Sequence, residues 1–198
     1  MVYQLIRVPT TEAAVLAGST VRIDTATGHG SGVHLGGGFF LTAGHVTQGA
    51  DKVHILTDQG TTLSGEVLWN NHGYDVSLVY VEENADISSS PLSCAPNYVG
   101  QDITILGNPL STLFAKSWGK VSGLSKTGLE AIDGDLWRVL VTLDITAAPG
   151  VSGGPIFNDQ GEVVGILVAG AVSLRGTFRY SYGVPGSAIC HVLGRTQA

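Results

Sequence analysis

Short segments in which apolar and polar residues alternate run through most of the chain, and this pattern constrains the fold more than any other feature. Turn residues such as Asp58-Gln59-Gly60, Asp133-Gly134 and Asp159-Gln160-Gly161 separate the segments at close intervals. Such spacing is typical of an all-β sandwich or barrel. The expected strands are residues 19–27, 52–58, 62–70 and 76–82 in the first half, and 102–108, 120–126, 136–144, 161–172 and 177–185 in the second.

The composition agrees with this pattern and limits the classes of partner. The 198 residues include 28 glycines, and only 13% are charged, about half of the usual share. The formal net charge is −6 and no basic run occurs, so we expect neither nucleic acid nor an anionic membrane as a partner. No apolar stretch reaches the ~20 residues that cross a bilayer, so we expect a soluble chain without a membrane span.

One helix is expected late in the chain, in the sequence GSAICHVLGR at residues 186–195. Ser187 is its expected N-cap, and Gly194 lies just past its expected end. Residues 84–100 carry Ser, Pro and Asn with little periodicity. We interpret them as a connector between two β halves.

The cysteines and histidines form no recognisable metal motif. Cys94 and Cys190 are too far apart for a zinc or redox motif, which favours two buried reduced thiols. His29 and His34 have no acidic or cysteine neighbours at ligand spacing. We therefore expect no metal site and no cofactor.

A glycine-rich loop surrounds Ser152 in the stretch AAPGVSGGPIFNDQGEVVGILVAG, residues 147–170. Gly150, Gly153 and Gly154 would be costly in a regular element, because glycine loses the most backbone freedom on folding. An ordinary Gly/Ser turn between strands is one interpretation. The other is a loop that turns its amide groups inward and exposes the serine hydroxyl, and residues elsewhere must decide between them.

A serine hydroxyl becomes nucleophilic only beside a base that is itself oriented by an acid. His45 follows an apolar segment at residues 39–41, and Asp75 directly precedes the expected strand at 76–82. The chain order is therefore His45, Asp75, Ser152. This is the order of the triad in the chymotrypsin-like double barrel.

The blocks that contain these residues resemble trypsin-like serine peptidases, in particular the protease domain of the Deg/HtrA branch. They are GSGVHLGGGFFLTAGHV (30–46), the segment 51–82 that ends in GYDVSLVYVE, ILGNPLSTLFAKSWGKVSGLS (105–125), TLDITAAPGVSGGPIFNDQGEVVGILVA (142–169) and YGVPGSAI (182–189). The resemblance implies two packed antiparallel β-barrels with a short C-terminal helix. Residues 1–93 would form the first barrel with His45 and Asp75, and residues 94–198 the second with Ser152.

The resemblance also implies a role for each site residue. Ser152 would be the nucleophile, His45 the base and Asp75 the orienting acid, with the amide groups of Gly150 and Ser152 as the oxyanion hole. The substrate-binding residues would be Thr146 at the base of the specificity pocket and Val168, Ala169 and Gly170 along one wall. None is charged, so we expect cleavage after small to medium apolar residues.

Several positions depart from the family pattern or extend it. Val151 stands where the digestive relatives have Asp, and Gly44 where alanine is usual. Glycine removes only a methyl group, so we do not expect Gly44 to cause a loss of function. From the length of 198 residues we expect no C-terminal PDZ module of ~100 residues. By analogy with the family, residues 1–18 would support a homotrimer.

The resemblance adds an alternative for the cysteines. Some trypsin-like relatives bridge the interdomain connector to the C-terminal helix, and Cys94 and Cys190 occupy those two elements. A Cys94–Cys190 disulfide would indicate an extracytoplasmic or secreted protein, and reduced thiols a cytoplasmic one.

Two alternatives to a serine endopeptidase stay open from the sequence. One is a non-catalytic module on the same fold that binds extended peptides by β-augmentation. The other is an esterase that uses the same nucleophile. The complete triad favours an enzyme over a binding module, since a fold alone implies no activity.

Overall fold

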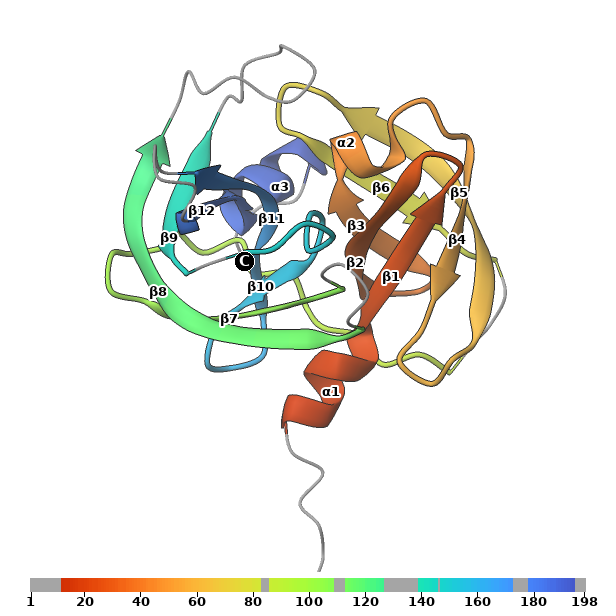
Figure 1. The fold of residues 1–198 in the computed structure, drawn as a ribbon, viewed down its shortest axis with the longest axis horizontal. Helices are drawn as coiled ribbons and strands as arrows, with labels where there is room; N and C mark the ends of the chain where they lie inside the picture. Colours follow the sequence, from red (N-terminus) through yellow and green to blue (C-terminus); the bar gives the residue numbers. More distant parts are fainter. Residues whose placement is uncertain are drawn as a thin grey trace, which may run out of the picture.

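Two closed six-stranded antiparallel barrels lie side by side (Figure 1). The computed structural model describes residues 12–82, 86–108, 113–126, 139–145, 147–172 and 178–194. The strand order is β1-β2-β3-β6-β5-β4 in the first barrel and β10-β11-β12-β9-β8-β7 in the second. The all-β, two-barrel fold class expected from the sequence is therefore confirmed. The division at residue 93 stays a proposal.

The expected strands are present, and their bounds differ mainly in the second barrel. The strand expected at 120–126 begins earlier, at Ala115, and residues 136–138 and 177 of two other expected strands lie outside the described residues. The strands are β1 (Thr20–Thr25), β2 (Gly28–Gly36), β3 (Phe39–Ala43), β4 (Lys52–Leu56), β5 (Thr62–Asn71), β6 (Val76–Tyr80), β7 (Asp102–Gly107), β8 (Ala115–Lys126), β9 (Leu140–Asp144), β10 (Pro155–Phe157), β11 (Val163–Val172) and β12 (Phe178–Pro185).

Alternation along the strands fills the barrel interiors. In β4, Val53 and Ile55 are buried while Lys52 and His54 are exposed, because successive side chains point to opposite faces. Val53 and Ile55 join Phe40 in the interior of the first barrel. An equivalent apolar cluster fills the second barrel and includes Val151 from the glycine-rich loop.

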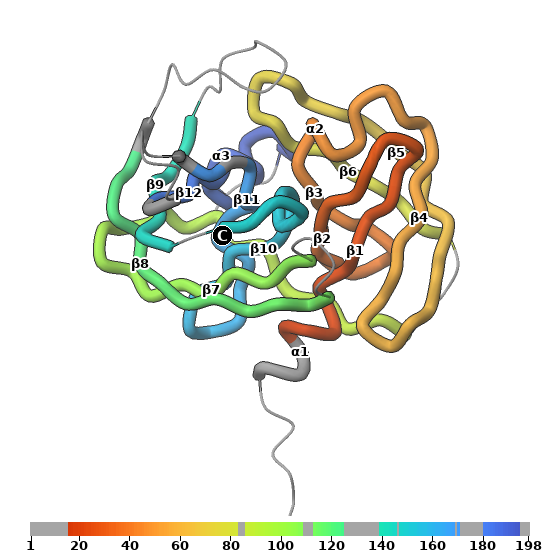
Figure 2. Tube along the Cα trace, viewed as in Figure 1, coloured from red at the N-terminus to blue at the C-terminus, as the bar shows by residue number. Residues whose placement is uncertain are grey.

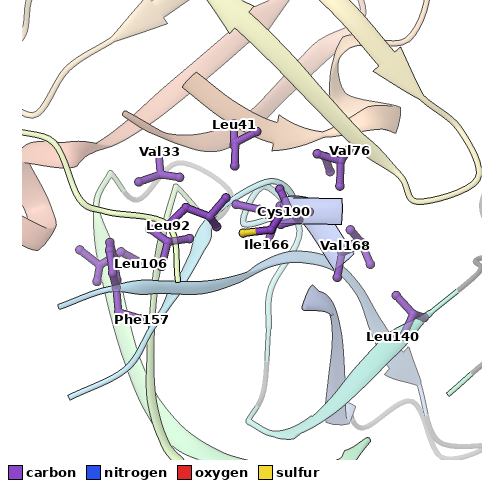
Figure 3. Packing of buried hydrophobic residues seen from close by; sticks show 14 of the residues in the cluster. Val33, Leu41, Val76, Leu92, Leu106, Leu140, Phe157, Ile166, Val168 and Cys190 are labelled. Atoms are coloured by element: carbon purple, nitrogen blue, oxygen red, sulfur yellow. The ribbon is translucent and has the colours of Figure 1, made fainter. Parts of the chain in front are cut away.

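A third apolar cluster lies between the barrels and joins them. Val33, Leu41 and Val76 of the first barrel face residues of the second (Figure 3), including Leu106 and Ile166. Each such side chain contributes roughly 1.5–3 kcal/mol when fully buried. This cluster, the seam between the barrels, holds the two barrels in one fixed arrangement. Side chains from both barrels can therefore be kept at fixed positions relative to each other.

Among the described residues, three helices accompany the barrels: α1 (Glu12–Ser19), α2 (Gly44–Thr47) and α3 (Gly186–Val192). The predicted N-cap of the last helix was wrong. Pro185 in extended conformation is the N-cap residue of α3, without a side-chain cap, because β12 leads directly into the helix. Gly194 lies past its end with a φ of 69°, as predicted. Neither α1 nor α2 was predicted from the sequence.

Cys94 and Cys190 form a disulfide that ties the connector to α3, with Cα atoms 5.7 Å apart. The interpretation as reduced thiols is therefore wrong, and the pairing implied by the resemblance is confirmed. Cys190 is buried in the cluster between the barrels, and Cys94 packs against that cluster. The disulfide thus fixes α3 against the apolar cluster between the barrels.

Candidate active site

His45 and Asp75 are brought together by the register of two neighbouring strands. In the β3–β6 pair, Ala43 at the end of β3 lies opposite Val76 at the start of β6. His45 follows Ala43 in the short helix α2, and Asp75 immediately precedes Val76. The two side chains therefore meet at one edge of the first barrel, although 30 positions separate them in sequence.

The Asp75 carboxylate makes two kinds of hydrogen bond with His45. Oδ1 accepts the main-chain N–H of His45 at 2.8 Å, and Oδ2 lies 2.9 Å from the ring Nδ1. The Asp75 side chain is only 7% exposed, and the backbone there has a φ of 55°. With Nδ1–H donating to the carboxylate, the neutral ring keeps Nε2 as its acceptor.

Asn70 supports the same corner from β5. Its Nδ2 donates to the Gly44 carbonyl at 2.6 Å and to Thr47 Oγ1 at 3.1 Å, so it holds both ends of α2. A Cβ at residue 44 would lie 2.7 Å from Asn70 Oδ1 and 3.1 Å from Asp75 Oδ1. The packing around residue 44 therefore favours glycine, because the Asn70 side chain occupies the space that a methyl group would need.

The loop that carries Ser152 extends from the second barrel onto the first (Figure 2). The Ser152 carbonyl accepts the main-chain N–H of Ser31 in β2 at 2.8 Å. Gly153 has a φ of 86°, and a Cβ there would overlap the Ser31 carbonyl and the Thr42 hydroxyl. This close approach needs glycine and brings the loop to the end of β3, directly before Gly44 and His45.

The main-chain amides of this loop divide into two groups. Val151 N–H donates to the Ala148 carbonyl, Gly153 N–H to Leu167 and Gly154 N–H to Val151. Gly150, with a φ of 96° after Pro149, occupies the third position of the turn that the first of these bonds closes. Within the part of the chain that the structure describes, the Gly150 and Ser152 amides donate to no protein acceptor.

The predicted substrate-binding residues are described only in part. Thr146 and the side chain of Ala169 lie outside the described residues. The Val168 side chain is buried in the cluster between the barrels (Figure 3), so it is not available to a substrate. Gly170 is exposed on β11.

Two further properties concern the described residues alone. In these ranges, no group of three or more His, Cys, Asp and Glu side chains is arranged to hold a metal ion. The helices in the same ranges are too short or too polar to cross a membrane.

Three polar residues beside the candidate site were not predicted from the sequence: Ser31, Asn70 and Asn108. Ser31 and Asn108 both lay inside recognised blocks. Asn70 ends an expected strand. Apart from the bond between Phe114 and Asn108, which are six positions apart, the hydrogen bonds of their side chains reach partners between 23 and 119 positions away, so no local pattern could have revealed them.

Comparison with known proteins also points to trypsin-like peptidases. A family profile described as "Trypsin-like peptidase domain" matches residues 30–166. HhoA of Synechocystis sp. is 32% identical over 145 residues, which cover 72% of this chain and 37% of that protein. The serine protease Do-like HtrA of Bacillus subtilis is 25% identical over 151 residues, covering 72% of this chain and 34% of that protein. The chain thus spans about a third of the length of these curated relatives.

Solved structures share the fold at lower sequence identity. The active form of the Rv3671c protease from M. tuberculosis superimposes with a TM-score of 0.80 at 21% identity, covering 94% of this chain and 85% of the other. The HtrA-type protease AlgW with a tripeptide gives a TM-score of 0.77 at 20% identity, covering 93% and 62%.

Proposed function

Since the chain belongs to the trypsin-like peptidase family, as a protease domain of the Deg/HtrA branch, we propose that it is a serine endopeptidase with His45, Asp75 and Ser152 as its triad. The observation that supports this most is the His45–Asp75 hydrogen bond at the end of β3, against which the Ser152 loop is docked. A binding module would need neither the oriented histidine nor a loop held this closely.

The proposed reaction is acyl transfer to water. Ser152 Oγ attacks the scissile carbonyl while His45 Nε2 accepts the hydroxyl proton and then passes it to the leaving amine. In deacylation His45 Nε2 accepts a proton from water, the water oxygen attacks the acyl carbonyl, and the proton passes to Ser152 Oγ as the acid is released. Asp75 keeps the proton on Nδ1 and stabilises the imidazolium that forms in each step.

We propose the amides of Gly150 and Ser152 as the oxyanion hole. Their lack of a protein acceptor among the described residues supports this, because the three other amides of residues 150–154 are already paired. A donor aimed at developing negative charge is worth ~10²–10³ in rate. Pairing the other amides within the protein leaves these two for the tetrahedral intermediate.

A peptide is the proposed substrate because β11 offers an edge to pair with. β10 pairs only with residues up to Ile166, and Leu167 is bonded to the Ser152 loop. Beyond Leu167, β11 has β12 on one side and no described strand on the other. An extended peptide can add as a strand there. With no charged residue among Thr146, Val168, Ala169 and Gly170, we propose cleavage after small to medium apolar residues.

Casein digestion tests this proposal directly. The wild-type chain and the Ser152→Ala variant are incubated with casein, and the cut sites are mapped by mass spectrometry. Cuts after Ala, Val, Leu and Met that disappear in the variant are expected. Hydrolysis of a simple ester without any casein cleavage would favour the esterase, and no reaction of Ser152 with a fluorophosphonate would favour the binding module.

We also propose that activity needs no freed N-terminus. The Val151 side chain is buried in the apolar cluster of the second barrel, where it packs against β-strand residues and cannot form an ion pair. A chain with an N-terminal tag should therefore react with a fluorophosphonate as fast as the untagged chain. Labelling of only a cleaved form would contradict this.

The disulfide supports an extracytoplasmic location as part of the proposal. Structural disulfides persist in oxidising compartments and are rare in the cytosol. Fractionation of cells that express the full-length protein, with thiol alkylation before lysis, would test it.

A further inference from the structure

One buried residue between the barrels, Ser31, contacts both residues of the proposed oxyanion hole, through its hydroxyl and through its main-chain amide. Ser31 Oγ lies 2.9 Å from the Gly150 carbonyl oxygen, and the Ser31 main-chain N–H donates to the Ser152 carbonyl at 2.8 Å. A single residue of β2 thus binds the loop on either side of Val151. Ser31 is itself fully buried, and its own carbonyl accepts the Thr42 hydroxyl at 2.7 Å.

Asn108 determines the direction of the Ser31 hydroxyl. The Asn108 main-chain N–H donates to Ser31 Oγ at 2.8 Å, and Asn108 Nδ2 approaches it at 3.4 Å. A hydroxyl has one proton and two lone pairs. Since both Asn108 groups are donors, the proton of Ser31 is left for the Gly150 carbonyl, which can only accept.

Asn108 is held in turn by the rest of its surroundings. It is fully buried, its Nδ2 also donates to the Val21 carbonyl at 3.2 Å, and its Oδ1 accepts the Phe114 N–H at 3.0 Å. Gly107 leaves room for the arrangement, because a Cβ there would lie 3.1 Å from Ser31 Oγ and 2.9 Å from a Val151 methyl group. The orientation of the hydroxyl is therefore built into the seam.

The bond from Ser31 fixes the peptide group that joins the two proposed donors. The 150–151 peptide lies between the Gly150 and Ser152 amides, and its own N–H is held by the Ala148 carbonyl. With its carbonyl held by Ser31, both sides of this peptide are anchored. The direction of one donor amide relative to the other then depends on the anchored peptide.

From these contacts we infer that Ser31, oriented by Asn108, is a positioning residue for the oxyanion hole. The inference rests on the proposed function. Ser31 touches neither substrate nor reacting atoms and acts through Gly150 and Ser152. Its loss would leave the His45–Asp75 pair in place and weaken stabilisation of the tetrahedral intermediate alone.

The test compares Ser31→Ala with Ser19→Ala as a matched control. Ser19 is equally buried and its hydroxyl also has two partners, the Leu16 carbonyl at 3.1 Å and Ser90 Oγ at 2.7 Å. It lies at the end of α1, away from the Ser152 loop. Any general effect of deleting a buried hydroxyl should appear in both variants.

Ser31→Ala should lower kcat roughly 10- to 100-fold, somewhat less than loss of a donor itself, with little change in KM. Affinity for a peptide aldehyde, which forms a tetrahedral adduct with Ser152, should fall by the same factor. Rates are normalised to the fraction of chains that a fluorophosphonate labels at completion. Ser19→Ala should keep the wild-type kcat and aldehyde affinity.

Equal kcat in Ser31→Ala and wild type, or a change confined to KM, would overturn the inference while leaving the proposed function intact. A wild type no more active than Ser152→Ala would instead refute the proposed function. If Ser31→Ala does not fold, Ser31→Cys decides the matter, because a thiol is a weaker donor of similar shape. It should show a reduced kcat at unchanged KM, and a wild-type kcat would again overturn the inference.

Discussion

Asp75 holds His45 by its backbone and by its ring at once. Oδ1 accepts the His45 main-chain N–H at 2.8 Å, and Oδ2 lies 2.9 Å from Nδ1. The first bond assigns Oδ1 an acceptor role that cannot change, since a main-chain amide only donates. The second atom of the carboxylate, Oδ2, faces Nδ1. Whether the atom at that place accepts or donates a hydrogen bond therefore controls which ring nitrogen carries the proton.

Asp75→Asn should lower kcat on the order of 10⁴-fold, because the wrong histidine tautomer is then favoured. The asparagine oxygen must stay with the His45 N–H, so its NH2 group faces Nδ1 and the ring proton moves to Nε2. A histidine in that state cannot take the proton of Ser152. Steady-state hydrolysis of a peptide substrate measures the effect, with thermal unfolding as the control for folding. A loss of less than tenfold in a folded variant would contradict the assignment.

Gly44→Ala should destabilise the chain by about 1–3 kcal/mol, as overpacking does in a filled site. The added methyl group would lie 2.7 Å from Asn70 Oδ1, and Asn70 cannot move without breaking its bond to the Gly44 carbonyl. The free energy of unfolding is measured for Gly44→Ala, Asn70→Ala and the double variant. The cost of the methyl group should be smaller once Asn70 is absent. Additive costs would show that Asn70 does not determine the need for glycine.

Some site residues could be predicted from the sequence and others could not. The difference is whether a local pattern or only a partner distant in sequence marks the residue. His45, Asp75 and Ser152 could be selected because their residue types, chain order and glycine-rich context all belong to one reaction. Ser31, Asn70 and Asn108 have polar side chains in places where polar residues are ordinary. Contacts between the barrels reveal the partners of Ser31 and Asn108, and the packing of α2 on β5 reveals those of Asn70.

The same limit applies to the secondary structure. Alternation with period two predicted nine of the twelve described strands, because each of them buries one face in a barrel, and β2, β3 and β10 were not among the strands expected from it. Helix α2 is only four residues long and has too few positions for a periodic pattern. Ser187 has the side chain of an N-cap, but β12 continues to Pro185, so the chain enters α3 before a serine cap could form.

Gly153→Ala should abolish reaction with a fluorophosphonate, and Gly49→Ala should not. Both glycines have positive φ, 86° and 73°, so alanine costs about 1–2 kcal/mol at either position. A Cβ at Gly49 would meet nothing within 4 Å, whereas one at Gly153 would overlap the Ser31 carbonyl and the Thr42 hydroxyl. The labelling rate and the unfolding temperature of both variants separate the backbone cost from the overlap. Equal behaviour of the two variants would show that close docking of the loop is not required.

Removal of the disulfide should affect stability much more than chemistry. Cys94 and Cys190 are 96 positions apart, and loss of a native bridge typically costs 2–5 kcal/mol. For a chain of this size, the double variant Cys94→Ser/Cys190→Ser should unfold at a temperature lower by about 4–20 °C. The disulfide lies at the apolar cluster between the barrels, while His45 and Ser152 are held by β2, β3 and β6. At temperatures well below unfolding, kcat should therefore stay near the wild-type value.

Reduced wild-type chain should unfold at the same temperature as the double variant, which excludes an effect of serine itself. Thiol titration of the denatured, unreduced wild type completes the test: no reactive thiol is expected, and two per chain would contradict the bridge.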